Sequence, residues 1–171
     1  MRDEIEQAGY YYVTVPDKPG AAAKILIRFR QAGINLLAFT AFPKGGGQSQ
    51  LDFVPENGAA FERAAHSMEL QISDRKTVFL IRGDKHPEAI DEHLINLARQ
   101  GINVTSCQAL ASEPGRYAAL LWVKPADQPE AADALTGKQV SDESGGDAVD
   151  IASEGSFPAS DPPSRAAPTR S

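Results

Sequence analysis

Residues 13–20 of the chain read Val13-Thr14-Val15-Pro16-Asp17-Lys18-Pro19-Gly20, and residues 31–35 read Gln31-Ala32-Gly33-Ile34-Asn35. The β-branched residues of the first stretch predict a strand, and its Pro and Gly residues predict a turn. Between the two stretches, apolar residues recur at the spacing of an amphipathic helix. Gly33 stands where the end of a helix favours a left-handed residue. The predicted order is therefore strand, turn, helix, glycine stop and next strand.

The same pattern occurs a second time at an offset of 68 residues, as from Gly33 to Gly101. A repeat of this kind indicates two structural units of equal length. Matches at this offset run from the first expected strand to the last: 31–35 with 99–103, Pro19 with Pro87, Leu26 with Leu94, Ile27 with Ile95, Gly47 with Gly115, and 71–73 with 139–141.

We define copy one as residues 9–74 and copy two as residues 75–141. Each copy is predicted to fold as βαββαβ, the ferredoxin-like unit in which two helices cover one face of an antiparallel sheet. The expected fold class is α+β, with two such modules in tandem. Copy one should have strands at 10–16, 34–42, 48–54 and 69–73 and helices around 22–29 and 59–68; copy two should have strands at 76–82, 102–111, 117–123 and 138–141 and helices around 90–98 and 127–135.

Two-residue alternation assigns the strand side chains to faces. On the face toward the helices we expect Tyr11, Val13, Val15, Phe79 and Ile81, covered by Ala22, Ile25, Leu26 and Phe29 in copy one and by Ile90, Leu94, Leu97 and Ala98 in copy two. Four apolar residues fall on the opposite face, and Ile27 and Ile95 lie off the core stripes of their helices. Because apolar side chains need cover, we expect both sets to form packing surfaces between copies or between two chains. The four residues are Tyr10, Tyr12, Val78 and Leu80.

Residues 142–171 are rich in Ser, Gly and Pro and have few large apolar residues. Such a segment buries too little surface to offset its chain entropy. We therefore expect a disordered C-terminal tail.

The composition excludes several classes of function. The net charge of −6, without a basic stripe, argues against a nucleic-acid binder. No apolar run reaches the length of a membrane span. The first residues are acidic and lack the apolar core of a signal peptide, so we expect a cytoplasmic protein. A single cysteine, Cys107, fits a reducing compartment.

The turn at 17–20 has the chemistry of a small anion site. Free backbone N–H groups and the positive end of the helix dipole favour a carboxylate or phosphate at a helix start. Pro19 fits the first helical turn, and Gly20 allows close approach to the backbone. Asp17 could cap the helix or accept a ligand's ammonium group. Plain capping of the helix is the alternative interpretation.

The motif Val15-Pro16-Asp17-Lys18-Pro19-Gly20, followed by a helix and by Gly33-Ile34-Asn35-Leu36, resembles the ACT domain family. The resemblance covers about residues 9–141 as two modules. It implies a non-catalytic regulatory protein that binds an amino acid or related metabolite between paired modules. It further implies a homodimer, a regulated enzyme or transporter as partner, and no cofactor. The ligand-binding residues implied are Asp17, Lys18, Pro19, Gly20, Ala21, Ala22 and Asn35.

Copy two departs from this pattern. It keeps Pro87 and Asn103, but Glu88 replaces the glycine. A carboxylate at that point repels an anionic ligand, and its side chain blocks close approach. We therefore expect copy two to be mainly structural, or to complete the site of copy one. The stretch Thr40-Ala41-Phe42-Pro43 also resembles, through its proline alone, a motif of aromatic amino-acid regulatory modules, which favours an apolar or aromatic ligand.

No catalytic constellation is evident. His86 and His93 lie too far apart for a two-ligand metal site and are expected on a solvated helix face. Cys107 is expected as a small buried hydrophobe in a strand. Gly45-Gly46-Gly47 lacks the context of a P-loop and is interpreted as a flexible hairpin. Two alternatives to the ligand-binding interpretation remain: a protein–protein interaction module without ligand, and an RNA-binding RRM-like module, which shares the βαββαβ order.

Overall fold

The computed structural model describes residues 3–84 and 86–137. The strand expected at 138–141 and the tail expected at 142–171 lie outside these residues. In each copy the order is strand, helix, two strands and helix, and short 3₁₀ turns precede the two helices of copy two. The elements are β1 Glu4–Pro16, α1 Ala21–Gln31, β2 Leu36–Gly45, β3 Gln48–Pro55, α2 Gly58–Ser67, β4 Lys76–Gly83, η1 Pro87–Ala89, α3 Ile90–Arg99, β5 Val104–Glu113, β6 Arg116–Val123, η2 Pro125–Asp127 and α4 Gln128–Thr136.

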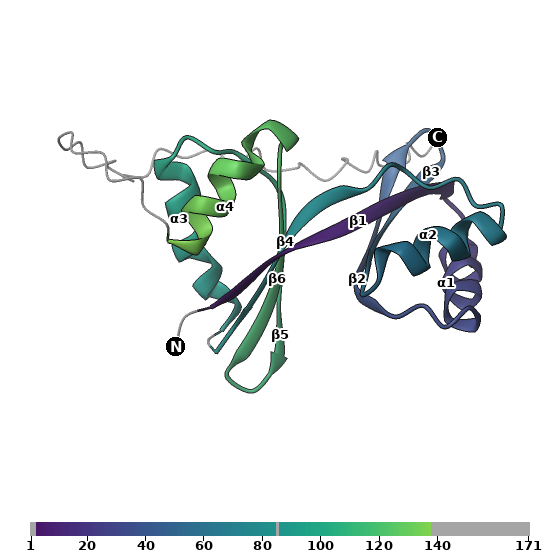
Figure 1. Ribbon diagram of the computed structural model, residues 1–171, viewed down its shortest axis with the longest axis horizontal. Coiled ribbons are helices and arrows are strands. Elements are labelled where there is room, and N and C mark those ends of the chain that lie inside the picture. The colour runs from purple at the N-terminus through teal and green to yellow at the C-terminus, as the bar shows by residue number, and fades with distance from the viewer. Residues whose placement is uncertain (1–2, 85, 138–171) are drawn as a thin grey trace, which may run out of the picture. The chain divides into compact units, whose positions relative to one another are not determined.

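The strands form one six-stranded sheet in the order β2-β3-β1-β4-β6-β5, and every pair of neighbours is antiparallel. This is the α+β, ferredoxin-like arrangement that the sequence predicts. The two copies, however, are joined edge to edge through β1 and β4. Figure 1 shows β1 as the long strand that passes β4 and continues into the sheet of copy one.

β1 is longer than predicted and serves both copies. Residues 11–16 pair with β3 of copy one, whereas residues 4–10 pair with β4 of copy two. The N-terminal half of β1 therefore lies beside β4, where a βαββαβ unit has its closing strand. The polar sequence Glu4-Ile5-Glu6-Gln7 gives little sign of this pairing.

The closing strand predicted at 69–73 is wrong, because no strand forms there. This segment follows β1 through one backbone bond, from Ser73 N–H to the Tyr12 carbonyl. The Ser73 hydroxyl accepts the Tyr12 N–H at 3.0 Å, in the place of a backbone carbonyl. A side chain that bonds the backbone in this way competes with a regular ladder.

Each pair of helices covers one face of the sheet, and the predicted inward strand residues are confirmed in both copies. In copy one, Phe29 of α1 and Phe61 of α2 stack with ring centroids 4.4 Å apart. In copy two, Leu97 of α3 is fully buried among β4 and β6 side chains. Ala98 is exposed and His93 is buried instead, so the predicted stripe of α3 is wrong at that one position.

The opposite face of the sheet, here called the back face, holds a third apolar cluster that joins the two copies. The Tyr10 and Trp122 rings meet edge to face, with centroids 6.2 Å apart. The cover expected for Val78 and Leu80 therefore comes from the other copy. Ile27 and Ile95 remain exposed, as their positions off the core stripes predict. The buried members of the cluster are Ala8, Val54, Val78, Leu80, Leu120 and Trp122.

Candidate functional site

The turn between β1 and α1 opens on a cavity of about 410 Å³, here called the α1 cavity. This volume lies within the range of roughly 300–1,000 Å³ that is usual for small-molecule sites. Five of the seven copy-one residues predicted to bind ligand line it, while Pro19 and Asn35 do not. The lining residues are Val15, Pro16, Asp17, Lys18, Gly20, Ala21, Ala22, Ala23, Ala41, Phe42, Pro43, Ser49 and Leu51.

The start of α1 faces this cavity without a side-chain cap. Gly20 precedes the helix with φ = 81°, a left-handed conformation that other residues adopt at a cost. No side chain bonds the first N–H groups, and the first turn contains no acidic residue. By contrast, Asn57 caps α2 by accepting the Ala60 N–H at 2.9 Å. The positive end of α1 is therefore left open toward the cavity.

Asp17 does not cap α1, so that interpretation of the sequence is wrong. Its Oδ1 instead accepts the Ser49 hydroxyl of β3 at 2.9 Å. Its N–H donates to the Gly47 carbonyl at 2.8 Å, which ties the turn to the glycine hairpin between β2 and β3. These two bonds hold the carboxylate at the edge of the cavity. Gly45, Gly46 and Gly47 all have positive φ, so this hairpin requires its glycines.

The α1 cavity combines charges of both signs with apolar walls. Asp17 is negative, whereas Lys18 and the open helix start are positive. The remaining walls come from β1, β2 and β3, and the Phe42 ring is the largest side chain among them. Such a cavity has partners for the carboxylate and the ammonium of one small zwitterion, and an apolar surface for its side chain.

Asn35 lies at the other end of copy one. Its Nδ2 donates to Glu56 Oε2 at 3.1 Å, and its carbonyl accepts the Glu56 N–H. At about 3.3 Å per residue, the stretch of β2 from Leu36 to Phe42 spans roughly 20 Å. Asn35 of this copy therefore cannot share a small ligand with Asp17 of the same copy.

The equivalent turn of copy two has a different chemistry. Pro87, Glu88 and Ala89 form a 3₁₀ turn that leads directly into α3. Glu88 is exposed there, and the first turn of α3 adds Asp91 and Glu92. Three carboxylates at a helix start disfavour an anionic ligand. Asn103 is exposed before β5, in the position equivalent to Asn35.

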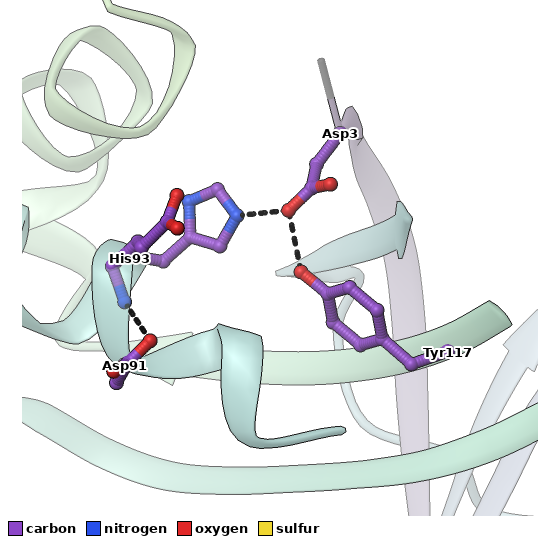
Figure 2. Close-up of polar contacts among 5 residues, drawn as sticks. Asp3, Asp91, His93 and Tyr117 are labelled. Atoms are coloured by element: carbon purple, nitrogen blue, oxygen red, sulfur yellow. Dashed lines mark hydrogen bonds and ion pairs between the residues drawn. The ribbon is translucent and has the colours of Figure 1, made fainter. Parts of the chain in front are cut away.

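Sequence reasoning missed a buried polar cluster in copy two, which Figure 2 shows. Asp3, just before β1, accepts the Tyr117 hydroxyl of β6 at 2.5 Å through Oδ2. His93 Nε2 of α3 lies 2.8 Å from the same oxygen. Burial, followed by the hydrogen bond to Asp3, raises the pKa of Tyr117 well above its ordinary value. The cluster thus joins the start of β1 to α3 and β6.

The prediction that His93 is solvated is wrong, because it is only 8% exposed. Within residues 3–84 and 86–137, its Nδ1 has no hydrogen-bond partner. No local signal could have revealed this cluster, since Asp3 is 90 residues from His93 and 114 from Tyr117. Only pairing of the N-terminal half of β1 with β4 brings the three side chains together.

Other chemistry predicted from single residues is modest. Cys107 is exposed rather than buried, because β5 is an edge strand whose residues mostly face solvent. His86 is exposed. Over residues 3–84 and 86–137, no three His, Cys, Asp or Glu side chains gather as a metal site. None of the helices within those ranges is long and apolar enough to cross a membrane.

Comparison with known proteins identifies the fold. No family model and no curated protein matches the sequence. Among solved structures, a protein from Bacteroides thetaiotaomicron is similar with a TM-score of 0.66 at 15% identity, over 78% of this chain and 90% of that one. The regulatory subunit of aspartate kinase from Thermus thermophilus, in its ligand-free form, has a TM-score of 0.54 at 18% identity, over 80% and 96%. The corresponding subunit from Thermus flavus has a TM-score of 0.53 at 20% identity, over the same shares.

At these identities the likeness establishes the fold. The chain has the α+β, ferredoxin-like fold of ACT-type regulatory domains, as the sequence resemblance predicts.

Proposed function

We propose that this protein is a non-catalytic regulatory module that binds an amino acid or a related small metabolite in the α1 cavity. The observation that carries the proposal is the uncapped start of α1, which opens on a cavity lined by Asp17 and Lys18. Fold likeness to regulatory subunits of aspartate kinase supports a regulatory role.

The charges of the cavity suggest how such a ligand lies. Its carboxylate accepts bonds from N–H groups in the first turn of α1 after that of Ala21, which donates to the Lys18 carbonyl at 3.3 Å. Its ammonium group donates to the Asp17 carboxylate, which Ser49 holds in place. Its side chain then lies against Phe42 and Leu51, so an apolar or aromatic amino acid fits best.

Asn35 takes part in this site only if it comes from another module. The predicted site at a module or subunit interface therefore implies a second chain, with Asn35 of one protomer reaching the α1 cavity of its partner. Homodimer formation is part of the proposal. A regulated enzyme or transporter is its proposed target.

The test is a thermal-shift panel of the standard amino acids at millimolar concentration. A ligand at about 100 times its dissociation constant adds about 2.7 kcal/mol to the free energy of unfolding, which raises Tm by several degrees. Asp17→Asn should remove most of the shift. Glu88→Gln, the same chemical change in the equivalent turn of copy two, should leave it intact.

Asn35→Ala distinguishes the two forms of the site. A lost shift, with Asn103→Ala unaffected, supports a site shared between protomers. A full shift in Asn35→Ala supports a site within one module. Equal shifts in wild type and Asp17→Asn would contradict the α1 cavity as the site.

A protein–protein interaction module without ligand is the second candidate. Ile27 and Ile95 favour it, because they are 44% and 37% exposed at equivalent positions of α1 and α3. No shift with any amino acid, together with dissociation of an oligomer by Ile27→Glu, would support this candidate. The RNA-binding alternative is disfavoured, because Trp122 is only 7% exposed, which leaves its ring too buried for a base to stack on it.

A further inference from the structure

A second cavity, of about 150 Å³, lies on the back face and is lined by strands of both copies. We call it the back-face cavity. It is separate from the proposed amino-acid site, although Phe42 lines both. Its lining residues are Tyr10, Thr40, Phe42, Gln50, Asp52, Thr105, Ser106, Gln108 and Trp122.

Asp52 is the only carboxylate among these lining residues, and it is 5% exposed. Its one hydrogen-bond partner in the described part of the chain is Gln50, whose Nε2 donates to Oδ1 at 2.8 Å. Burial raises the pKa of Asp52, and the bond from Gln50 opposes this effect. A buried carboxylate of this kind is costly unless positive charge or further donors accompany it.

Thr40 provides a second, independent observation. Its side chain is buried, with the residue 9% exposed, and Oγ1 has no hydrogen-bond partner among the residues that the structure describes. Thr40 is paired with Asp52 across the β2–β3 ladder, so the two side chains are neighbours on the same face. Buried hydroxyl groups are nearly always bonded. The unpaired Thr40 hydroxyl and the Asp52 carboxylate, which has one donor, thus lie side by side with unused hydrogen-bonding capacity.

Aromatic rings line another side of the cavity. Tyr10 and Trp122 lie edge to face, with an interplanar angle of 89°. Aromatic faces attract cations, and Trp does so best. Two lysines lie over the ring of Tyr12, which is paired with Asp52 across the β1–β3 ladder: Lys44 and Lys76 are 5.5 Å and 5.8 Å from the centre of that ring. Neither forms an ion pair with Asp52 in the part of the chain that the structure describes.

We propose that the back-face cavity binds a small organic ammonium group, which donates N–H bonds to the Asp52 carboxylate and to Thr40 Oγ1 and contacts the Tyr10 and Trp122 rings. An ammonium group supplies the missing donors and the missing positive charge together. A single carboxylate beside uncharged side chains is a poor ligand set for a divalent metal ion, which prefers several anionic oxygens. The negative charge of Asp52 would repel an anion. The proposed α1 site differs in that it also takes a carboxylate, at a helix start.

Trp122 is the only tryptophan of the chain, so its fluorescence reports directly on this cavity. The full-length protein is titrated with methylammonium chloride, and potassium chloride at equal ionic strength serves as the reference. We expect a saturable change in Trp122 fluorescence with methylammonium that potassium does not produce. Tetramethylammonium, which is cationic but has no N–H donor, should bind at least several-fold more weakly.

Three variants locate the binding. Asp52→Asn removes the charge but keeps the shape, and it should weaken methylammonium binding roughly tenfold or more. Thr40→Val removes only the hydroxyl and should weaken it by a smaller factor. Asp17→Asn, in the α1 cavity, should leave methylammonium binding unchanged while it removes any amino-acid response, so the two proposals fail separately.

The proposal is overturned if methylammonium gives no saturable change beyond that of potassium. It is equally overturned if tetramethylammonium binds as tightly as methylammonium, or if folded Asp52→Asn and Thr40→Val both bind as wild type does. Circular dichroism of each variant establishes that it is folded before the titration.

Discussion

At the scale of single residues, hydrogen bonds to carboxylates, some exposed and some buried, account for much of the polar chemistry of this chain. Asp17 is held by Ser49, Asp3 by Tyr117 and His93, and the Tyr11 hydroxyl by Glu62 at 2.6 Å. Gly20 contributes to the start of α1 through its backbone conformation alone. An added Cβ would meet no atom within 4 Å, so the requirement for glycine comes from its φ of 81° and not from crowding.

Tyr11→Phe should show that the Tyr11–Glu62 bond makes a pH-dependent contribution to the free energy of unfolding. Burial, together with the bond to Glu62, raises the pKa of Tyr11 to about 12 from an ordinary value of 10.0. The folded state thus favours the neutral phenol, and its contribution to stability is complete below about pH 10 and is lost as pH rises through about 12. We expect Tyr11→Phe to lose about 1–2 kcal/mol at pH 8.

The difference between wild type and Tyr11→Phe should shrink as pH rises from 10 toward 12. Urea midpoints at pH 8, 10 and 11.5, followed by circular dichroism, measure it. Lysine and other groups titrate in the same pH interval in both proteins. Taking the difference in stability between wild type and Tyr11→Phe removes their effect. A difference that stays constant over the range would contradict a raised pKa for Tyr11.

At the scale of elements, β1 is the strand on which the arrangement depends. Its C-terminal half leads into the α1 cavity, and its N-terminal half completes the sheet of copy two. The Asp3 cluster fastens that N-terminal half to α3 and β6. The N-terminal half of β1 is thereby held by side-chain bonds as well as by the ladder.

Asp3→Ala tests this fastening. The Tyr117 hydroxyl and His93 Nε2 would lose their acceptor, and an unsatisfied buried group costs about 1–3 kcal/mol. Glu6→Ala is the matched control, three residues further on in β1, because its ion pair with Arg82 at 3.3 Å is largely exposed. We expect the control to lose at most about 1 kcal/mol. Urea unfolding measures both, and an equal loss in the two variants would contradict a special role for Asp3.

At the scale of the whole molecule, the two copies are one structural unit over the described residues. They share β1, pair through β1 and β4, and bury a common cluster on the back face. Two modules joined only by a linker would unfold separately. A shared strand and a shared apolar cluster instead couple the unfolding of the two copies. Any ligand of either cavity therefore acts on the same folded unit.

Leu97→Ala tests this coupling. Leu97 is fully buried in the core of copy two, and its truncation should cost about 2–5 kcal/mol. If the copies unfold together, Trp122 fluorescence shows a single transition at lower stability. An amino acid that binds copy one then stabilises that same transition. Ile95→Ala, an exposed change on the same helix, should alter stability by about 0.5 kcal/mol or less. Two separate transitions in Leu97→Ala would show that copy one survives without copy two.

Local signals in the sequence account well for the elements and for the start of α1. Strand alternation, helix spacing and the glycines at 33 and 101 depend on near neighbours in the chain, and these glycines have φ of 72° and 69° as predicted. Local sequence signals fail where a side chain bonds the backbone in place of a strand partner, as at Ser73. They also fail where a strand is rich in polar residues, as at 4–10. The role of Asn35 in ligand binding stays a prediction, for a site shared between modules.

By itself the sequence determined the two repeats, the βαββ order within each and the turn at 17–20, because periodicity and turn chemistry act over a few residues. The tertiary structure alone decided the rest. It joined the copies through β1 and β4, buried Asp3 with partners 90 and 114 residues away, and placed Asp52 and Thr40 beside rings of both copies. The physical reason is that such contacts depend on which strand edges pair and which faces meet, and many pairings are compatible with the same local pattern.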